Sequence, residues 1–263
     1  MIHKTIILLV LMLTLSVVAA ADDIKVSDVE ALYGDNSYSK SEKGLKQSIN
    51  LGFASTRGNT DTLNLNGKYE MSFQTLGYEN RALLVHFNAS AFVTENNDVK
   101  DNEEYTVNLG LEQHIGTDWS GYTSFRWLQN EFQNYDNKFA LGAGVGKTFY
   151  DDGKHLFKAK LGIAYNVEEY SNTQEDHSYT SLTQYIGYTN KLNKLSDLYL
   201  KVGFSENIED FGDYEMLAVA GLNFEVAENF SVTLEGEIRY DKVPPIGFDT
   251  TDTKTIIRLG YSF

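Results

Sequence analysis

From residue 46 to the last residue, the chain is a series of segments in which apolar and polar residues alternate. In the clearest segment, Leu63, Leu65, Tyr69, Met71 and Phe73 alternate with Asn64, Asn66, Lys68, Glu70 and Ser72. Successive side chains of a strand point to opposite faces, so this period predicts strands with one apolar and one polar face. Twelve strands are expected, at 46–56, 62–74, 81–94, 103–115, 119–130, 138–149, 155–168, 178–190, 197–207, 214–226, 230–242 and 253–263. The segment 178–190 alternates poorly, which leaves its register the least defined.

The length of these segments discriminates between two all-β architectures. A soluble β-sandwich also alternates, but its strands usually have only about five or six residues. A strand that crosses a bilayer at a tilt needs about 9–11 residues, which these segments supply. No backbone group can stay unpaired in a bilayer, so the sheet must close on itself. The sequence therefore predicts an all-β fold, a closed antiparallel transmembrane β-barrel of about twelve strands spanning 46–263.

The connections between the segments differ in length and in charge. After a short first loop, the longer ones are expected at 95–102, 131–137, 169–177, 208–213 and 243–252, and the shorter ones at 75–80, 116–118, 150–154, 191–196 and 227–229. Acidic residues gather in the longer set, at Glu95, Asp98, Asp101, Glu169, Glu175, Asp176, Glu209, Asp210, Asp213, Asp249 and Asp252. Outer-membrane barrels have long extracellular loops and short periplasmic turns, so we expect the acidic loops to lie outside.

The first residues have the pattern of an export signal. Lys4 is followed by an apolar run at 6–18 and by Ala19, Ala20 and Ala21, which predicts a signal peptide over 1–21. Residues 22–45 are then expected to form a polar periplasmic arm or a small plug. The chain has no Cys, as suits an exported protein that does not rely on disulfides. These features predict the outer membrane of a Gram-negative bacterium, with its lipid as a partner.

The composition narrows the partners further. A formal net charge of -15 makes nucleic acid an improbable partner, because the phosphate backbone would be repelled. Aromatic residues make up 13% of the chain, with 17 Tyr, which suits girdles at the two membrane interfaces. Trp119 and Trp127 are expected to face outward at opposite ends of one strand.

The last ten residues, 254–263, resemble the closing strand of bacterial outer-membrane barrels. Thr255, Ile257, Leu259, Tyr261 and Phe263 fall on one face, and the chain ends on Phe. The resemblance implies that Tyr261 and Phe263 form an assembly signal and that the barrel assembly machinery is a partner.

Three further stretches resemble one bacterial family. They are Ser48–Thr62 with its Gly58-Asn59-Thr60 hairpin, Glu131–Gly146, and Pro245-Ile246-Gly247 together with the end of the chain. These are similar to the putative salt-induced outer-membrane proteins, a family of unknown function. The resemblance covers about 44–263 and implies an outer-membrane barrel with no established activity and no catalytic residues.

Charged residues on the polar face are the candidate functional residues. By parity, Arg126, Lys138, Lys158 and Lys160 form a basic wall of the lumen, and Glu225, Glu235 and Glu237 form an acidic wall opposite. Such a transverse field favours polar over apolar solutes, which predicts a passive, porin-like channel for small polar or ionic solutes. Cross-strand ion pairs, such as Glu237 with Arg258, would instead fill the lumen. The alternative is thus a structural or stress-responsive envelope protein.

An outer-membrane enzyme is the third alternative. His177 and Ser178 are adjacent on a strand and therefore point to opposite faces, so they cannot form a nucleophile–base pair. His86 and His114 are expected inside the barrel. Gly142, Gly144 and Gly146 lack the strand-to-helix context of a phosphate loop and are expected to leave room in the lumen. No catalytic residues, metal site or cofactor are predicted.

Overall fold

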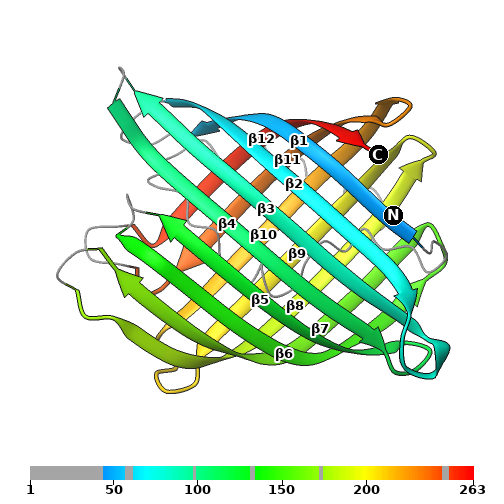
Figure 1. The fold of residues 1–263 in the computed structure, drawn as a ribbon, viewed down its shortest axis with the longest axis horizontal. Coiled ribbons are helices and arrows are strands. Elements are labelled where there is room, and N and C mark those ends of the chain that lie inside the picture. Colours follow the sequence, from blue (N-terminus) through cyan, green and yellow to red (C-terminus); the bar gives the residue numbers. More distant parts are fainter. Residues whose placement is uncertain (1–43, 57–61, 97–98, 131–133, 172–173, 245–248) are drawn as a thin grey trace, which may run out of the picture.

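The computed structural model describes residues 44–56, 62–96, 99–130, 134–171, 174–244 and 249–263. They form a closed barrel of twelve antiparallel strands, which confirms the predicted fold class (Figure 1). The strands are β1 (Gly44–Thr56), β2 (Thr62–Leu76), β3 (Ala82–Asn96), β4 (Val99–His114), β5 (Trp119–Asn130), β6 (Tyr135–Asp151), β7 (His155–Tyr170), β8 (His177–Asn193), β9 (Ser196–Asn207), β10 (Tyr214–Ala227), β11 (Phe230–Asp241) and β12 (Thr251–Ser262). The predicted signal peptide and nearly all of the predicted arm lie outside the described residues.

Each strand pairs with its neighbours in sequence, and β1 pairs with β12 to close the ring. The closing register runs from Ser48 opposite Ser262 to Ser55 opposite Thr255. Beyond it, the amide of Phe263 donates to the carbonyl of Gln47 at 3.0 Å. The even strand number brings Gly44 and Phe263 to the same end of the barrel (Figure 1). We call this end the terminal end and the opposite one the loop end.

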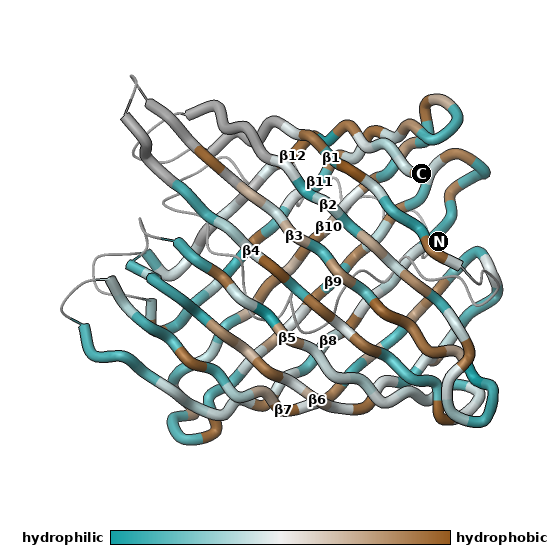
Figure 2. Tube along the Cα trace, viewed as in Figure 1, coloured by the Kyte–Doolittle hydropathy of each residue, from teal (hydrophilic) through white to brown (hydrophobic). Residues whose placement is uncertain are grey.

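The alternation in sequence becomes an inside and an outside. Along β5 the burial alternates, with Ser120, Tyr122, Ser124 and Arg126 buried and Trp119, Thr123 and Phe125 exposed. Large apolar side chains are exposed on the outer surface, including Leu141, Leu161, Ile163, Ile186, Ile257 and Leu259. Along the strands in Figure 2, apolar positions in brown are interspersed with polar positions in teal. These exposed side chains suit contact with lipid, since burying apolar surface away from water is favourable.

The poor alternation of β8 has a physical explanation. Its lumen-facing residues include Tyr179 and Tyr185, and its outward residues include Thr180 and Gln184, so both faces mix polar and aromatic groups. The strand is nevertheless regular, because its pairing to β7 runs unbroken from His155 opposite Asn190 to Glu168 opposite His177.

The connections at the terminal end are short turns, stabilised by hydrogen bonds to backbone amides and by residues in left-handed conformations. Asp152 accepts hydrogen bonds from the amides of Lys154 and His155 at 2.9 and 2.6 Å, and these amides lower the pKa of its carboxyl group. Gly153 (φ 79°) and Asn229 (φ 66°) adopt left-handed conformations, which these residues tolerate. The turn after β2 contains a 3-10 helix, η1 (Tyr78–Asn80), which the alternation did not predict.

Several strands extend beyond their predicted bounds at the loop end. β4 begins at Val99 rather than 103, and β6 begins at Tyr135 rather than 138. Pairing of β3 with β4 continues through a bulge to Asn96 opposite Val99. The residues at these strand ends are mostly polar, so they show no alternation of apolar and polar residues. A prediction based on that alternation therefore made these strands too short. No helix among the described residues is long and apolar enough to cross a membrane.

Candidate functional site in the barrel lumen

One side of the lumen is packed. Tyr122 of β5, Ala164 of β7, Tyr185 of β8 and Leu217 and Val219 of β10 form a buried cluster, with Tyr199 of β9 against it. We call this set the tyrosine cluster. Tyr122 lies directly over two glycines, since a Cβ built on Gly144 or Gly162 would come within 2.7 or 2.2 Å of its hydroxyl. The inward glycines therefore do leave room, as predicted, and a tyrosine of the same chain occupies it.

Two ion-pair groups connect strands that are not neighbours. Lys160 of β7 lies 2.7 Å from Glu112 of β4, which also accepts a hydrogen bond from Ser120. Lys138 of β6 lies 2.7 Å from Glu168 of β7 and 3.1 Å from Glu215 of β10. These side chains are almost wholly buried, at 4% exposed for Lys138 and 6% for Lys160. The packed side is therefore held together by side chains from β4 through β10.

The predicted basic wall is only partly correct. Arg126, Lys138, Lys158 and Lys160 are all buried and face the lumen, as expected. However, Lys138 and Lys160 bind carboxylates that stand among them, on β4, β7 and β10. Parity assigned each side chain to a face but gave no account of distances across the lumen. The two charge signs are therefore interleaved rather than segregated into opposed walls.

The predicted acidic wall is also only partly found in the structure. Glu235 and Glu237 are buried, but Glu225 is exposed at the terminal end, next to a bulge between β10 and β11. Of the expected pair of Glu237 with Arg258, the structure shows Arg258 2.5 Å from Glu235, with the charge of Glu237 also acting on it. Glu237 instead lies 3.4 Å from Arg239, two residues along its own strand. In the register, Glu237 stands opposite Lys254, four residues from Arg258.

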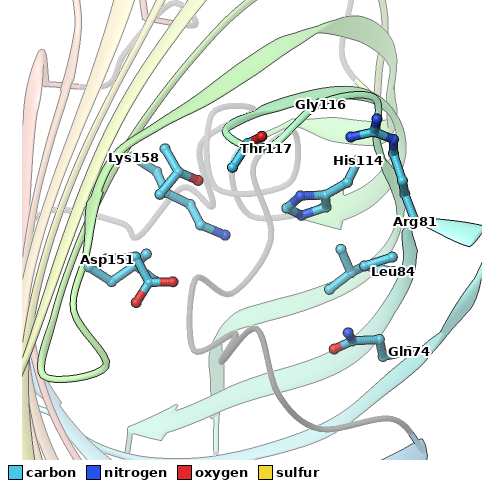
Figure 3. A pocket seen from close by; sticks show the side chains of 11 residues that line it. Gln74, Arg81, Leu84, His114, Gly116, Thr117, Asp151 and Lys158 are labelled. Atoms are coloured by element: carbon cyan, nitrogen blue, oxygen red, sulfur yellow. The ribbon is translucent and has the colours of Figure 1, made fainter.

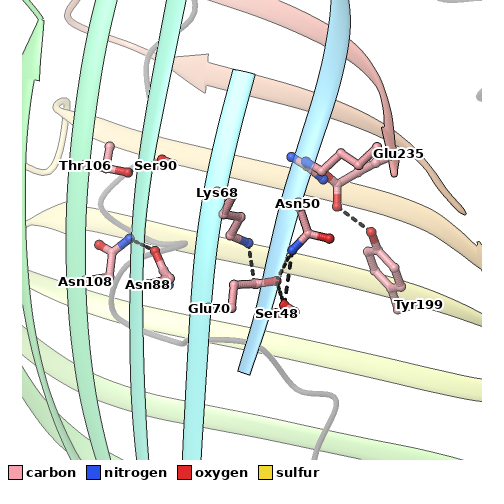
Figure 4. A network of polar contacts seen from close by, with 11 residues as sticks. Ser48, Asn50, Lys68, Glu70, Asn88, Ser90, Thr106, Asn108, Tyr199 and Glu235 are labelled. Carbon is pink, nitrogen blue, oxygen red and sulfur yellow. Dashed lines mark hydrogen bonds and ion pairs between the residues drawn. The ribbon is translucent and has the colours of Figure 1, made fainter. Parts of the chain in front are cut away.

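The other side of the lumen, on β1, β2 and β3, is polar and partly open. Glu70 of β2 lies 2.6 Å from Lys68 and accepts hydrogen bonds from Asn50 and Ser48 of β1 (Figure 4). Lys68 and Glu70 are 24% and 28% exposed, several times more than the pairs of the packed side. Among the described residues, the part of the lumen that side chains leave unfilled therefore lies against β1 to β3.

Two cavities adjoin this open side. One of about 500 Å³ is lined by residues including Ser48, Glu70, Ser72, His86 and Asn88. The second, of about 260 Å³, lies nearer the terminal-end turns, where Lys158 and Asp151 face Gln74, Leu84 and His114 across it (Figure 3). The inward positions predicted for His86 and His114 are thereby confirmed.

Carboxylates gather at the loop end as well. Asp213, in the connection before β10, accepts a hydrogen bond from Asn207 at 3.1 Å. Burial is the main cause of a raised pKa at Asp213, and the nearby Glu215, Asp241 and Glu168 raise it further. Asp213 therefore takes up a proton at a higher pH than an ordinary carboxyl group, and the charge at this mouth is pH-dependent.

The outer surface carries the predicted aromatic anchors. Trp119 is 47% exposed at the terminal end, with the Lys147 ammonium 5.0 Å from its ring, and Trp127 donates to Asn137 near the loop end. Phe263 is exposed at the terminal end and stacks on Tyr261, whose ring lies 4.9 Å from that of Phe230.

Sequence reasoning missed the tyrosine cluster and the open side. The signal available for the latter was the excess of Asn and Ser on the polar faces of β1 to β3.

Comparison with known proteins agrees with this architecture. A family model described as "Protein of unknown function, DUF481" matches residues 49–263. The uncharacterized protein YdiY of Escherichia coli (strain K12) is 25% identical over 250 residues, which cover 93% of this chain and 91% of that protein.

The solved structures similar to this chain include outer-membrane channels. An outer membrane channel from Pseudomonas putida F1 matches 92% of this chain and 100% of its own, with a TM-score of 0.52 and 8% identity. The KdgM porin matches 82% of this chain and 99% of its own, with a TM-score of 0.50 and 10% identity. The NanC porin matches 82% and 98%, with a TM-score of 0.50 and 9% identity. At such low identity these likenesses establish the fold alone, and the fold resembles that of bacterial outer-membrane proteins.

Proposed function

We propose that this chain, which belongs to the DUF481 family of proteins of unknown function, is a passive outer-membrane channel for small polar or ionic solutes. One observation carries the proposal. The closed barrel has an apolar exterior and an interior whose β1 to β3 side is polar and partly exposed, with a cavity of about 500 Å³ against it. Exposed charges inside a barrel favour a wet lumen, because charges in a dry one would be costly. The three channel and porin structures support this role over an enzymatic one.

The proposal places the barrel in the outer membrane of a Gram-negative bacterium, inserted by the barrel assembly machinery. The loop end faces outward, because outer-membrane barrels have their longer loops there. The acidic loops then surround the external mouth, where they concentrate cations at low ionic strength.

A structural envelope protein is the second candidate. The tyrosine cluster and the ion pairs of Lys138 and Lys160 favour it, since they fill one side of the lumen. A twelve-stranded barrel is intermediate in width between barrels filled by side chains and open sixteen-stranded porins. Conduction therefore decides between the two candidates.

The test is conductance in a planar bilayer. Folded protein should give discrete current steps, and the reversal potential in a salt gradient should indicate a cation preference that fades as salt rises. The preference should also weaken on acidification, starting at a pH above the ordinary carboxyl range, because Asp213 has a raised pKa. Asp213→Asn is the matched variant, and it should remove that early part of the pH dependence. Folded, inserted protein without current steps would contradict the channel and favour the structural candidate.

A further inference from the structure

Neutral side chains form a continuous arrangement on β2 and β3 of the open side and on the adjacent strand β4. Asn108 of β4 donates to Asn88 of β3 at 2.6 Å, and the hydroxyls of Ser90 and Thr106 lie 2.5 Å apart at the next inward position (Figure 4). Ser72 and Gln74 continue this surface along β2 towards the terminal end. We call these residues the amide–hydroxyl face: Ser72, Gln74, Asn88, Ser90, Thr106 and Asn108.

Two acceptors on this face have no hydrogen-bond partner among the described residues. They are Oε1 of Gln74 and Oδ1 of Asn108, on side chains that are 7% and 6% exposed. Gln74 points into the cavity of about 260 Å³, as Figure 3 shows. An unsatisfied buried acceptor is costly, and a donor from a passing solute would relieve that cost. A hydroxyl group can supply such a donor.

The charges beside this face are matched in pairs. Glu70 is neutralised by Lys68 at 2.6 Å, and Glu235 by Arg258 at 2.5 Å. Amides and hydroxyls both donate and accept hydrogen bonds, so they can replace the hydration of a hydroxylated solute. A charged solute would meet fixed charges of both signs here, since Lys158 and Asp151 line the smaller cavity and the Lys68–Glu70 pair lies on the open side, so it would lose hydration without a wall of opposite charge to replace it. The adjacent cavity of about 500 Å³ is within the usual range of about 300–1,000 Å³ for small-molecule sites.

We infer that the channel selects small neutral solutes rich in hydroxyl groups, of the size and chemistry of sugars, along the amide–hydroxyl face. This inference rests on the proposed channel function and specifies its substrate class. It places recognition on β2 to β4 and assigns the tyrosine cluster and its ion pairs to holding the barrel in shape.

The test is swelling of proteoliposomes in glucose, in glucuronate and in glucosamine at equal osmolarity. Wild-type protein should admit glucose several times faster than either charged analogue. The combined variant Gln74→Leu and Asn108→Leu should lower glucose entry by about tenfold, since one lost hydrogen bond corresponds to about that factor. Gln74→Leu removes an acceptor without a partner among the described residues, whereas Asn108→Leu also removes the hydrogen bond to Asn88, so folding of the variant is first verified by its heat-modifiable migration.

Thr183→Val is the matched control. It also removes a buried hydroxyl without a partner among the described residues, but on β8, at the packed side of the lumen. Its glucose entry should equal that of the wild type. Equal or faster entry of a charged analogue, or unchanged glucose entry in the double variant, would overturn the inference while ion conductance upholds the channel. Absence of both swelling and conductance would instead reject the channel function itself.

Discussion

Replacing Lys138 with Met should lower the free energy of unfolding by about 3–5 kcal/mol, the usual cost of removing one partner of a buried ion pair. Lys138 is 4% exposed and contacts Glu168 at 2.7 Å and Glu215 at 3.1 Å. Its loss would leave two carboxylates facing each other in the packed side of the lumen. The measurement is urea unfolding of the barrel in lipid vesicles.

Two further variants test whether the loss of stability comes from the buried ion pair. Arg81→Met removes an exposed ion pair, since Arg81 and Glu79 are 37% and 55% exposed and 3.3 Å apart. That variant should cost no more than about 1 kcal/mol. Adding Glu168→Gln and Glu215→Gln to Lys138→Met should restore part of the loss, because no unpaired charge then remains. Equal stability of the Lys138 and Arg81 variants would refute the account of the packed side.

Replacing Phe263 with Asp should prevent most of the protein from reaching the membrane. Phe263 directly follows the closing strand β12, and its backbone pairs with Gln47 of β1. The end of this chain resembles the signal that the assembly machinery recognises. A carboxylate near the membrane interface by itself costs only about 0–1 kcal/mol in a barrel, so a large defect would come from lost recognition.

Phe230→Asp is the matched control for this substitution. Phe230 is exposed on the same outer surface, with its ring 4.9 Å from that of Tyr261, but it lies within the chain. We expect heat-modifiable, membrane-inserted protein at near wild-type levels for Phe230→Asp and about tenfold less for Phe263→Asp, a factor equivalent to about 1.4 kcal/mol. Equal levels of the two variants would exclude a special role for the last residue.

The fold was predictable because one period governs almost the whole barrel. Alternation assigned the faces of Lys138, Glu235 and His86 correctly, since inward and outward residues follow from parity alone. Strand ends at Val99 and Tyr135 were missed, because polar hairpin residues carry no alternation.

The arrangement inside the lumen was not predictable by the same reasoning. Parity places a residue on a face but does not say which residues meet across the barrel. The contact of Lys138 on β6 with Glu215 on β10 joins two residues that are 77 positions apart in the chain. The close contact of Arg258 with Glu235 depends on side-chain reach, which register alone does not fix. The bulge that accompanies the exposed Glu225 also breaks the regular pattern.

The most direct test of a membrane barrel with a wet lumen is cysteine labelling along β3. The chain has no Cys, so single cysteines can be introduced without background. A membrane-impermeant maleimide should label cysteines at Asn88 and Ser90, which face the open side of the lumen. It should not label those at Phe87 and Ala89, which lie on the outer surface of the barrel, or at Thr183, which is fully buried on the packed side. Labelling at 87 and 89 as fast as at 88 and 90 would contradict the membrane barrel, and protection at all four would contradict the wet lumen.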